Sequence, residues 1–510
     1  MSERTGFKVI YALLLRQRPE RSSPIDDRPL SRRHQVRGAQ DRPGSQGSPR
    51  RLWWIVAAFL AVQVYVIWFA SNGPFVDEGL YTVAGMRVLE GKGLSDGYIT
   101  WFNGSPFVWP VIAAVGHRLG GLPGARFMAA ILSTVTLVAF ARTAENLFGR
   151  SVAEWCALAF AVNGLFMALA HFAVYDVAAL AGLAVSMWCV TRSSTTGASM
   201  WLIGAAIAFA CAVISKYGSM LMVVPLLGLL MSVRGFRSSG RALAVFLSVV
   251  GVILTAYFSL FFGSLFPTSS AAYLEQAFGR SRGHIVALQV VFALAPVSLA
   301  SVGALVVWRR GQRLLVVTCL LALSLYPLFH LWSANFVSAQ KHVVAGFLFA
   351  YLLAGVALER LWASRSRVTP VIVLAVLTVW GGLQCYWQDH SWSDTRTLAH
   401  YLALNMKSGD RVVAESSWNY ILYLYPRGMI ESPADVIDAN YPPRRDRLDV
   451  CRIPWLVGNP DSADMIRAAV GHCHHQNVLS STTRQYYFDT TRLRLGASSV
   501  VVGLYRLPQP

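Results

Sequence analysis

The sequence has little charge for its length. Only 14% of its 510 residues are Asp, Glu, Lys or Arg, whereas 55% are hydrophobic and the mean hydropathy is +0.45. A soluble protein of this size needs more charged residues to cover its surface, so this class is excluded. The apolar runs are as long as membrane-spanning helices, which excludes the alternating strands of an outer-membrane barrel. The composition predicts a polytopic helical membrane protein.

The sequence also lacks the motifs that bind nucleotides. It contains no D-x-D motif, no P-loop and no G-x-G-x-x-G that follows a strand. A site for a cytosolic nucleotide sugar is therefore not indicated. Acidic residues are scarce as well, with 26 Asp and Glu against 45 Lys and Arg, and the net charge is +19. The positions of the basic residues argue against a nucleic-acid partner.

Many of the basic residues lie in the N-terminal segment. Residues 1–51 contain twelve Lys or Arg and five Asp or Glu, in a stretch rich in Ser, Pro, Gly and Gln. This composition predicts a disordered basic tail on the cytoplasmic side. Its apolar piece Val9–Leu15 is too short and wrongly flanked for a cleavable signal. We therefore expect the first long apolar run, Leu52–Ala70, to be a retained membrane anchor.

The sequence predicts eleven membrane spans, and their connections differ in charge. The spans are expected at 52–70, 126–141, 152–170, 174–191, 199–215, 218–233, 242–266, 285–308, 314–331, 343–358 and 368–385. Beyond the first loop, connections on one side contain twelve Arg and those on the other side four Lys or Arg. Because basic residues accumulate on the cytoplasmic side, this bias places the N-terminus inside and the C-terminal region outside.

Three domains follow from these patterns. They are the tail 1–51, a transmembrane domain 52–385 with an outer loop 71–125, and an extracytoplasmic domain 386–510. The loop is long enough to hold amphipathic helices on the outer face. Residues 386–510 alternate strand-like and helix-like runs, which predicts a small α/β domain. The predicted fold is thus an all-α polytopic membrane bundle of about eleven transmembrane helices, located in the plasma (inner) membrane, with this domain outside. Cys451 and Cys473 are able to pair there, although the sequence does not show that they do.

Two acids, Asp77 and Glu78, directly follow the first span, in the segment PFVDEGLY. Charge at the end of a span is costly unless it has a partner or a role. A carboxylate pair at this place would supply a general base at the membrane surface. The alternative is an interfacial helix that begins with acids because its N-terminal dipole favours them. The two acids alone do not decide between these interpretations.

On the predicted topology, further polar residues gather at the outer ends of the spans. They are Asp176, Lys216, Tyr217, Arg280, Arg282, His284, Lys341 and His342. Each has an ordinary explanation, such as a lysine that extends its amine to the lipid headgroups. Together they place two carboxylates and several cations on one face of the membrane.

The order of short motifs along the chain resembles a known superfamily. The motifs are DExxY (77–81), SPFVWP (105–110), GxxGARF (121–127), YDVA (175–178), SKY (215–217) and QKH (340–342). In this order they resemble the C-type (GT-C) membrane glycosyltransferases, in particular the protein O-mannosyltransferase and aminoarabinose-to-lipid-A transferase branch. The resemblance covers about residues 50–360, and no motif of that family is found in 386–510.

The resemblance implies a multi-span enzyme whose donor is a sugar linked to a polyprenyl phosphate. It implies that an acid of the first outer loop is the catalytic base, which would be Asp77. Glu78 and Asp176 would then help to hold the acceptor, and Tyr81 and Tyr217 would support the site. The acceptor would be a glycan, lipid or protein of the cell envelope, and no nucleic acid or cofactor is expected.

The expected chemistry is a single displacement with inversion. A lipid phosphate develops negative charge as the sugar departs, so fixed cations would stabilise the transition state. The candidates for this role are Lys216, Lys341, His342, Arg280 and Arg282. Asp77 would remove the proton of the acceptor hydroxyl.

Two other functions fit parts of the pattern. A transporter or flippase for a lipid-linked sugar would use the acids and Lys216 as a relay, but transporters place such residues near the membrane midplane in repeated halves. A metal-dependent transferase of the same superfamily would use Asp77, Glu78 and Asp176 to bind Mg²⁺ or Mn²⁺. The sequence does not identify the sugar or the acceptor.

Overall fold

The structure is a computed structural model of the whole chain. It describes residues 49–93, 102–265, 282–333, 339–364, 367–439, 450–459, 466–467, 470–471, 473, 475–489 and 494–507. The chain divides into two units, 1–46 and 47–510, and all described residues belong to the second. Nearly all of the predicted basic tail therefore lies outside the described residues, as does Arg280.

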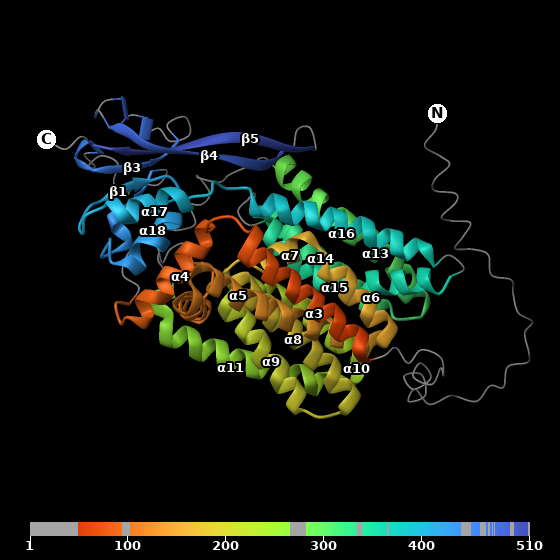
Figure 1. Cartoon of the computed structure of the whole chain (residues 1–510). Coiled ribbons are helices and arrows are strands. Elements are labelled where there is room, and N and C mark those ends of the chain that lie inside the picture. The colour runs from red at the N-terminus through yellow and green to blue at the C-terminus, as the bar shows by residue number, and fades with distance from the viewer. Residues whose placement is uncertain are drawn as a thin grey trace, which may run out of the picture. The chain divides into compact units, whose positions relative to one another are not determined.

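Helices form most of the described chain (Figure 1). Those before the C-terminal region are α3 (Pro49–Tyr65), η1 (Val66–Ala70), α4 (Val76–Leu89), α5 (Val108–Phe148), α6 (Arg150–Ala161), α7 (Gly164–Leu169), α8 (Tyr175–Thr196), α9 (Met200–Ser215), η3 (Tyr217–Met222), α10 (Val223–Arg234), η4 (Phe236–Ser238), α11 (Gly240–Leu265), α13 (Arg282–Arg309), α14 (Arg313–Ser333), α15 (Ala339–Trp362) and α16 (Val368–Asp389).

Each of the eleven predicted spans coincides with helical residues. Among the residues that the structure describes, nine helices are long and apolar enough to cross a membrane, judged by length and composition. The other two predicted spans are shorter: 199–215 is the 16-residue helix α9, and 152–170 is divided between α6 and α7. The polytopic helical bundle is confirmed, with nine long helices instead of about eleven.

The division of the third predicted span has a local cause at Asn163. Its Oδ1 accepts a hydrogen bond from the backbone N–H of Phe166 at 3.0 Å and so caps the start of α7. Its Nδ2 donates to the hydroxyl of Tyr351 in α15 at 3.1 Å. Because Asn163 starts a new helix, α6 ends after 12 residues and is too short to cross the membrane by itself.

The second predicted span is the latter part of a longer helix. The 41 residues of α5 leave helical geometry at Gly120 and Gly121, just before Pro123. Gly121 has a φ of 62°, in the left-handed region that favours glycine, and proline lacks the backbone donor that a helix needs. The kink separates the span from an earlier helical part that belongs to the predicted first loop.

The predicted first loop therefore contains two helical parts, which differ in their surroundings. The first part of α5 exposes the apolar side chains of Ile112, Val115 and Leu119, as expected of a helix at a membrane surface. In contrast, α4 is buried from Glu78 to Arg87 between α5 and α18. The helix is present as predicted, but it is enclosed rather than amphipathic.

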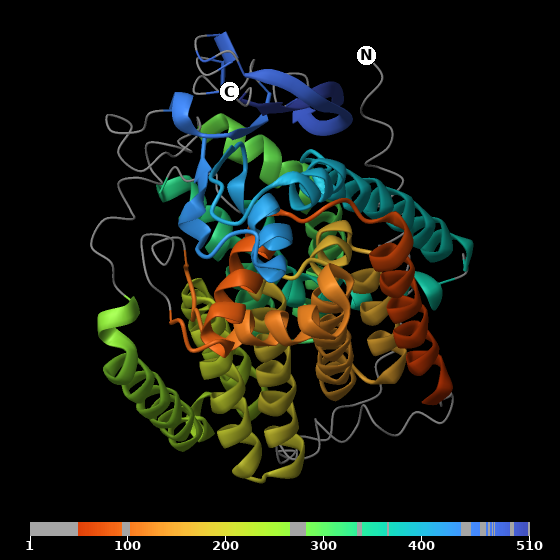
Figure 2. The same cartoon turned by 60° about the vertical axis from the view of Figure 1, so that its left-hand side comes forward.

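Helix α15 lies at the centre of the bundle. In its most apolar window 83% of the residues are buried, against 17% for α11, which lies at the margin in Figure 2. A small residue permits the close packing of α13 against it: a Cβ on Gly303 would lie 1.8 Å from the carbonyl oxygen of Leu353. The start of α15, which carries two predicted site residues, is therefore held by a rigid support.

The C-terminal region forms a mixed sheet with short helices. Its elements are α17 (Arg396–Asn405), β1 (Val412–Ala414), α18 (Ser417–Leu424), η5 (Tyr425–Arg427), η6 (Pro433–Asp435), β2 (Val436–Asp438), η8 (Val450–Arg452), β3 (Trp455–Gly458), β4 (Gln476–Asp489) and β5 (Arg494–Arg506). The strand order is β2-β1-β3-β5-β4, with β1 parallel to β2 and β3, and β5 antiparallel to β3 and β4. The small C-terminal α/β region is confirmed, and Cys451 and Cys473 form a disulfide.

The C-terminal region packs directly on the segment that follows the first span. Helices α17 and α18 lie between the sheet and the membrane helices (Figure 1). The centre of the Trp392 ring lies 5.0 Å from the centre of the Phe75 ring and 5.5 Å from that of the Phe172 ring. Asn72 Nδ2 also donates to the backbone oxygen of Trp392 at 2.9 Å. The C-terminal region thus supports residues 72–75, next to the predicted base.

The contact between α4 and α18 gives a first prediction. A Cβ on Gly79 would lie 2.2 Å from the carbonyl oxygen of Trp418, in a fully packed interface. Gly79→Ala should therefore destabilise the protein by about 1–3 kcal/mol, the usual cost of overpacking. Thermal unfolding of the purified protein in detergent measures this.

The matched control is Gly382→Ala, because a Cβ at this position in α16 meets nothing within 4 Å. Its unfolding temperature should stay unchanged or rise slightly, since alanine is a better helix former than glycine. Equal unfolding temperatures for the two variants would contradict the close packing of α4 on α18.

Candidate active site

Asp77 lies in the first turn of α4 and is paired with Lys341. Lys341 Nζ donates to Asp77 Oδ2 at 2.6 Å, although the two residues are 264 positions apart. The side chain of Asp77 is 26% exposed and that of Lys341 11%. The amine also lies 4.8 Å from the centre of the Phe75 ring. The first residues of α15 therefore approach the carboxylate predicted to be the base.

A second acid–lysine pair lies beside the first. Asp176 is in the first turn of α8, and Lys216, which ends α9, donates a hydrogen bond from Nζ to Asp176 Oδ1. Both side chains are almost completely buried. Unlike a lysine that extends to the headgroups, Lys216 points inward, 5.2 Å from the centre of the Tyr175 ring.

The segment around Lys216 is fixed by the aromatic loop that precedes α5. The backbone N–H of Tyr217 donates to the oxygen of Asn103 at 2.8 Å, and that of Ser105 donates to the oxygen of Ile214 at 2.7 Å. Two motifs of the sequence, SPFVWP and SKY, are thereby joined by backbone hydrogen bonds. Their proximity explains how residues far apart in the chain form one site.

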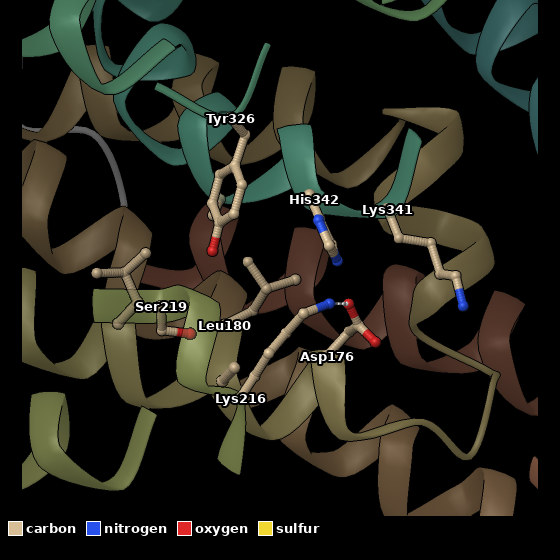
Figure 3. A pocket seen from close by; sticks show the side chains of 10 residues that line it. Asp176, Leu180, Lys216, Ser219, Tyr326, Lys341 and His342 are labelled. Atoms are coloured by element: carbon tan, nitrogen blue, oxygen red, sulfur yellow. Dashed lines mark hydrogen bonds and ion pairs between the residues drawn. The ribbon is translucent and has the colours of Figure 1, made fainter. Parts of the chain in front are cut away.

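The second pair, Asp176 and Lys216, lines a small cavity together with Lys341 of the first pair (Figure 3). It has about 290 Å³ of free space, part of it open to solvent. Lys216 reaches Asp176 from one side, while His342 points toward the pair from α15. His342 Nδ1 also lies 2.8 Å from His330 Nε2 in α14. The polar residues that line the cavity are Asp176, Lys216, Ser219, Tyr326, Lys341 and His342.

Glu78 has a different environment from its neighbour Asp77. It is fully buried and forms a bidentate ion pair with Arg126, with distances of 2.8 Å from Nε to Oε1 and 2.7 Å from Nη2 to Oε2. Its oxygens also accept the backbone N–H groups of Phe75 and Ala173, each at 2.8 Å. All of these contacts are internal, so Glu78 holds the loop rather than facing the cavity.

Arg126 completes the same network. Its Nη1 donates to Ser71 Oγ at 2.7 Å and to the oxygen of Asn72 at 3.0 Å, and Nη2 donates to the oxygen of Gly73 at 3.0 Å. With the two bonds to Glu78, all five donors of the guanidinium are used. The sequence pattern GxxGARF includes this residue, but it was given no role. A charge at the start of a predicted span was the available signal.

Three other predicted site residues, Tyr81, Tyr217 and Arg282, do not line the cavity. Tyr81 is buried, and the centre of its ring lies 4.5 Å from that of Tyr175. Burial and the nearby negative charge of Asp77 raise the pKa of its phenol well above the usual value. It therefore remains a neutral hydroxyl. Tyr217 packs on Phe258 of α11, and Arg282 is exposed at the start of α13, outside the lining of the cavity.

The three carboxylates that were considered as ligands for Mg²⁺ or Mn²⁺ are each paired with a different cation. Asp77 contacts Lys341, Glu78 contacts Arg126 and Asp176 contacts Lys216. In the described part of the chain they do not form a cluster of metal-binding groups. Their arrangement suits the positioning of cations better than the sharing of one metal ion.

A larger cavity lies between the end of the first span and the C-terminal region. It has about 1510 Å³ of free space, including its open part. The membrane region contributes Trp68, Phe69 and Arg126 to its wall, and the C-terminal region contributes Arg396 and Tyr423. The same loop that carries Asp77 therefore separates two cavities.

Comparisons with known proteins identify the fold. A family model described as dolichyl-phosphate-mannose-protein mannosyltransferase matches residues 105–260. The structure resembles that of ArnT from Cupriavidus metallidurans bound to undecaprenyl phosphate, with a TM-score of 0.61 and 15% identity over 89% of this chain and 98% of that chain. This chain has the fold of the C-type membrane glycosyltransferases.

Two further structures show related similarity. The apo form of the same ArnT has a TM-score of 0.61 and 16% identity, and covers 90% of this chain and 98% of its own. The apo oligosaccharyltransferase of Archaeoglobus fulgidus has a TM-score of 0.49 and 9% identity, over 89% of this chain and 75% of that chain. A comparison with curated proteins finds no match.

The fold implied by the motif resemblance is thereby confirmed, and the family model supports the resemblance over residues 105–260. The matched residues 105–260 include the segments that carry Asp176 and Lys216. The roles of individual residues stay predictions, because no comparison tests them.

The ion pair of Arg126 gives a second prediction. Arg126→Met would leave the carboxylate of Glu78 buried without its cation, which typically costs about 3–5 kcal/mol. The partly exposed pair of Arg142 and Glu145 provides the control, since Arg142→Met should cost no more than about 1 kcal/mol. Thermal unfolding in detergent measures both variants, and similar losses would show that the buried pair is not a main support.

Proposed function

We propose that this protein transfers a sugar from a polyprenyl-phosphate-linked donor to an acceptor hydroxyl on the non-cytoplasmic side of the plasma (inner) membrane. The observation that carries the proposal is the pairing of Asp77 with Lys341 beside the second pair, Asp176 and Lys216. This places a partly exposed carboxylate next to two lysines at the ends of membrane helices.

The distribution of arginine supports this sidedness. The site lies at the start of α8 and of α15, whereas Arg192 and Arg360 lie near the opposite ends of the same helices. Basic residues accumulate at the cytoplasmic ends of spans, so the site belongs to the other side of the membrane. Donors on that side are tethered to the membrane by a lipid.

The cations beside this cavity suit the phosphate of such a donor. Lys216, Lys341 and His342 line the cavity, and fixed cations stabilise the charge that develops on a departing lipid phosphate. The similar ArnT structure is described as bound to undecaprenyl phosphate, which supports a donor of this kind. Arg282 lies outside the lining, so we assign it no contact with the phosphate.

Lys341 also links donor binding to activation of the base. Its amine donates to Oδ2 of Asp77, one of the two oxygens that are able to take a proton. A donor phosphate competes for that amine and leaves the carboxylate of Asp77 able to accept a proton. The order of events is therefore donor binding first and deprotonation of the acceptor second.

Asp77 then removes the proton of the acceptor hydroxyl, whose oxygen attacks the anomeric carbon of the sugar. The bond between this carbon and the phosphate oxygen breaks, and the lipid phosphate leaves with the electron pair on the opposite side. The product has inverted configuration. Asp176 holds Lys216 and Glu78 holds the loop, so both position the reacting groups.

A transporter or flippase is the second candidate. It would need its charged residues near the membrane midplane, whereas these residues are at the ends of α8, α9 and α15. The arrangement therefore favours transfer over transport. A purified assay with a lipid-linked sugar, with and without a chelator, separates transfer, transport and metal dependence.

The role of Asp77 gives a third prediction. Asp77→Asn keeps the shape of the side chain but removes its ability to accept a proton, so turnover should fall by at least about 10²-fold. Donor binding should change little, because a base acts mainly in the transition state. The control is Asp394→Asn, a partly exposed acid paired with Arg396. Normal turnover in Asp77→Asn would remove this residue as the base.

The two lysines give a fourth prediction. If each holds the donor phosphate, Lys216→Met and Lys341→Met should weaken donor binding by about 1–3 kcal/mol, the value of a charge-assisted contact. Lys92→Met is the control, because Lys92 is an exposed lysine paired with Glu90. Binding of a labelled polyprenyl phosphate to the purified protein measures all three, and unchanged affinity in both site variants would exclude the two lysines.

A further inference from the structure

A second group of polar residues lies at the end of the bundle where α16 leaves the membrane region. Cys385 and Asp389 are four residues apart in the last turns of α16, on one face of the helix. His171, from the turn between α7 and α8, reaches the same place. All three are buried, and their ligand atoms lie within 4.8 Å of one another.

The hydrogen bonds of His171 show which of its ring nitrogens faces Asp389. Its Nδ1 lies 2.9 Å from Oε1 of Gln63 in α3, and its Nε2 lies 2.7 Å from Oδ1 of Asp389. An amide oxygen accepts, so Nδ1 carries the proton and donates to Gln63. A metal-binding histidine usually donates its other ring N–H in this way, which directs the lone pair of Nε2 toward the metal.

The carboxylate of Asp389 faces Nε2 of His171. Buried charges are costly unless they are paired. In the described part of the chain, Asp389 forms an ion pair with His171, and the nearby Arg126 uses all its donors elsewhere. A metal ion held by Nε2 and the carboxylate would balance the charge of this buried acid.

Cys385 favours the metal ion. Its Sγ lies 4.0 Å from Oδ2 of Asp389, on the same side as His171. Imidazole, thiolate and carboxylate together are ligands typical of zinc, and small shifts bring them to zinc–ligand distances of about 2.0–2.3 Å. A divalent ion with one thiolate, one carboxylate and a neutral imidazole gives a site without net charge, as a buried position requires.

We propose that His171, Cys385 and Asp389 form a zinc-binding site. On binding, the thiol of Cys385 loses its proton to solvent and Nε2 of His171 coordinates the metal as a neutral imidazole.

The site joins three parts of the chain that meet beside the catalytic loop. His171 precedes Ala173, whose N–H bonds Glu78, and Asp389 precedes Trp392, which packs on Phe75. Zinc at this place would hold the exit of α16 against the segment that carries Asp176. Its role is structural, and the proposal is independent of the proposed sugar transfer.

The test uses the full-length protein purified in detergent, with any histidine tag removed. After treatment with a chelator, the protein is titrated with Zn²⁺, and bound metal is measured by elemental analysis. We expect the wild type to bind zinc and Cys385→Ser to bind it at least about 10-fold more weakly. Cys189→Ser is the matched control, because Cys189 has the same 6% exposure as Cys385 in another helix.

A second measurement tests the proposal on the wild-type protein, in case Cys385→Ser does not fold. Cobalt added to the wild-type protein in place of zinc should give the strong charge-transfer absorption of a thiolate bound to cobalt. Zinc binding that is unchanged in Cys385→Ser, or cobalt bound without that absorption, would overturn the proposal. A wild-type protein that binds no metal would overturn it as well.

Discussion

The buried pair of Glu78 and Arg126 is the interaction on which the rest of the site depends. A charge in the interior of a membrane bundle is stable only when every polar atom around it has a partner. Arg126 meets this condition with five hydrogen bonds, three of them to residues 71–73. Glu78 extends the network to Phe75 and Ala173. One ion pair thereby fixes the end of the first span, the start of α4 and the approach to α8 relative to one another.

This network of hydrogen bonds also positions the reactive groups. Asp77 is next to Glu78 in α4, and Asp176 lies three residues after Ala173, so both acids are placed by the same pair. Each then meets a lysine from a different element, and both lysines line the cavity. A ligand that enters it must offer negative charge to compete for the lysines, which is the property of a phosphate.

Much of this was predictable from the sequence, and the limits have physical causes. Long apolar runs marked the spans, and the motifs around Asp77, Asp176, Lys216 and Lys341 identified one face and one superfamily. The break at Asn163 was missed because an apolar run does not reveal that a side chain caps a new helix. The difference between Asp77 and Glu78 was also hidden, since adjacent residues on a helix point in different directions.

The sequence did not predict the partners of the acids, for another reason. Arg126 meets Glu78, and His171 meets Asp389, only through the packing of helices, and nothing in the local sequence specifies that packing. The surroundings of Cys385 could not be predicted for the same reason, because its neighbours in space come from α3 and the turn before α8. Buried polar clusters between helices are visible only once the bundle is assembled.

The contact of α18 with α4 has a consequence for the biosynthesis of the protein. Helix α4 is completed on one side by residues 417–424, which are made more than 300 positions later. Until that part of the chain has emerged and folded, the face of α4 around Gly79 has no cover. The packing of α4 is therefore completed only near the end of synthesis, after every membrane helix of the described chain has been made.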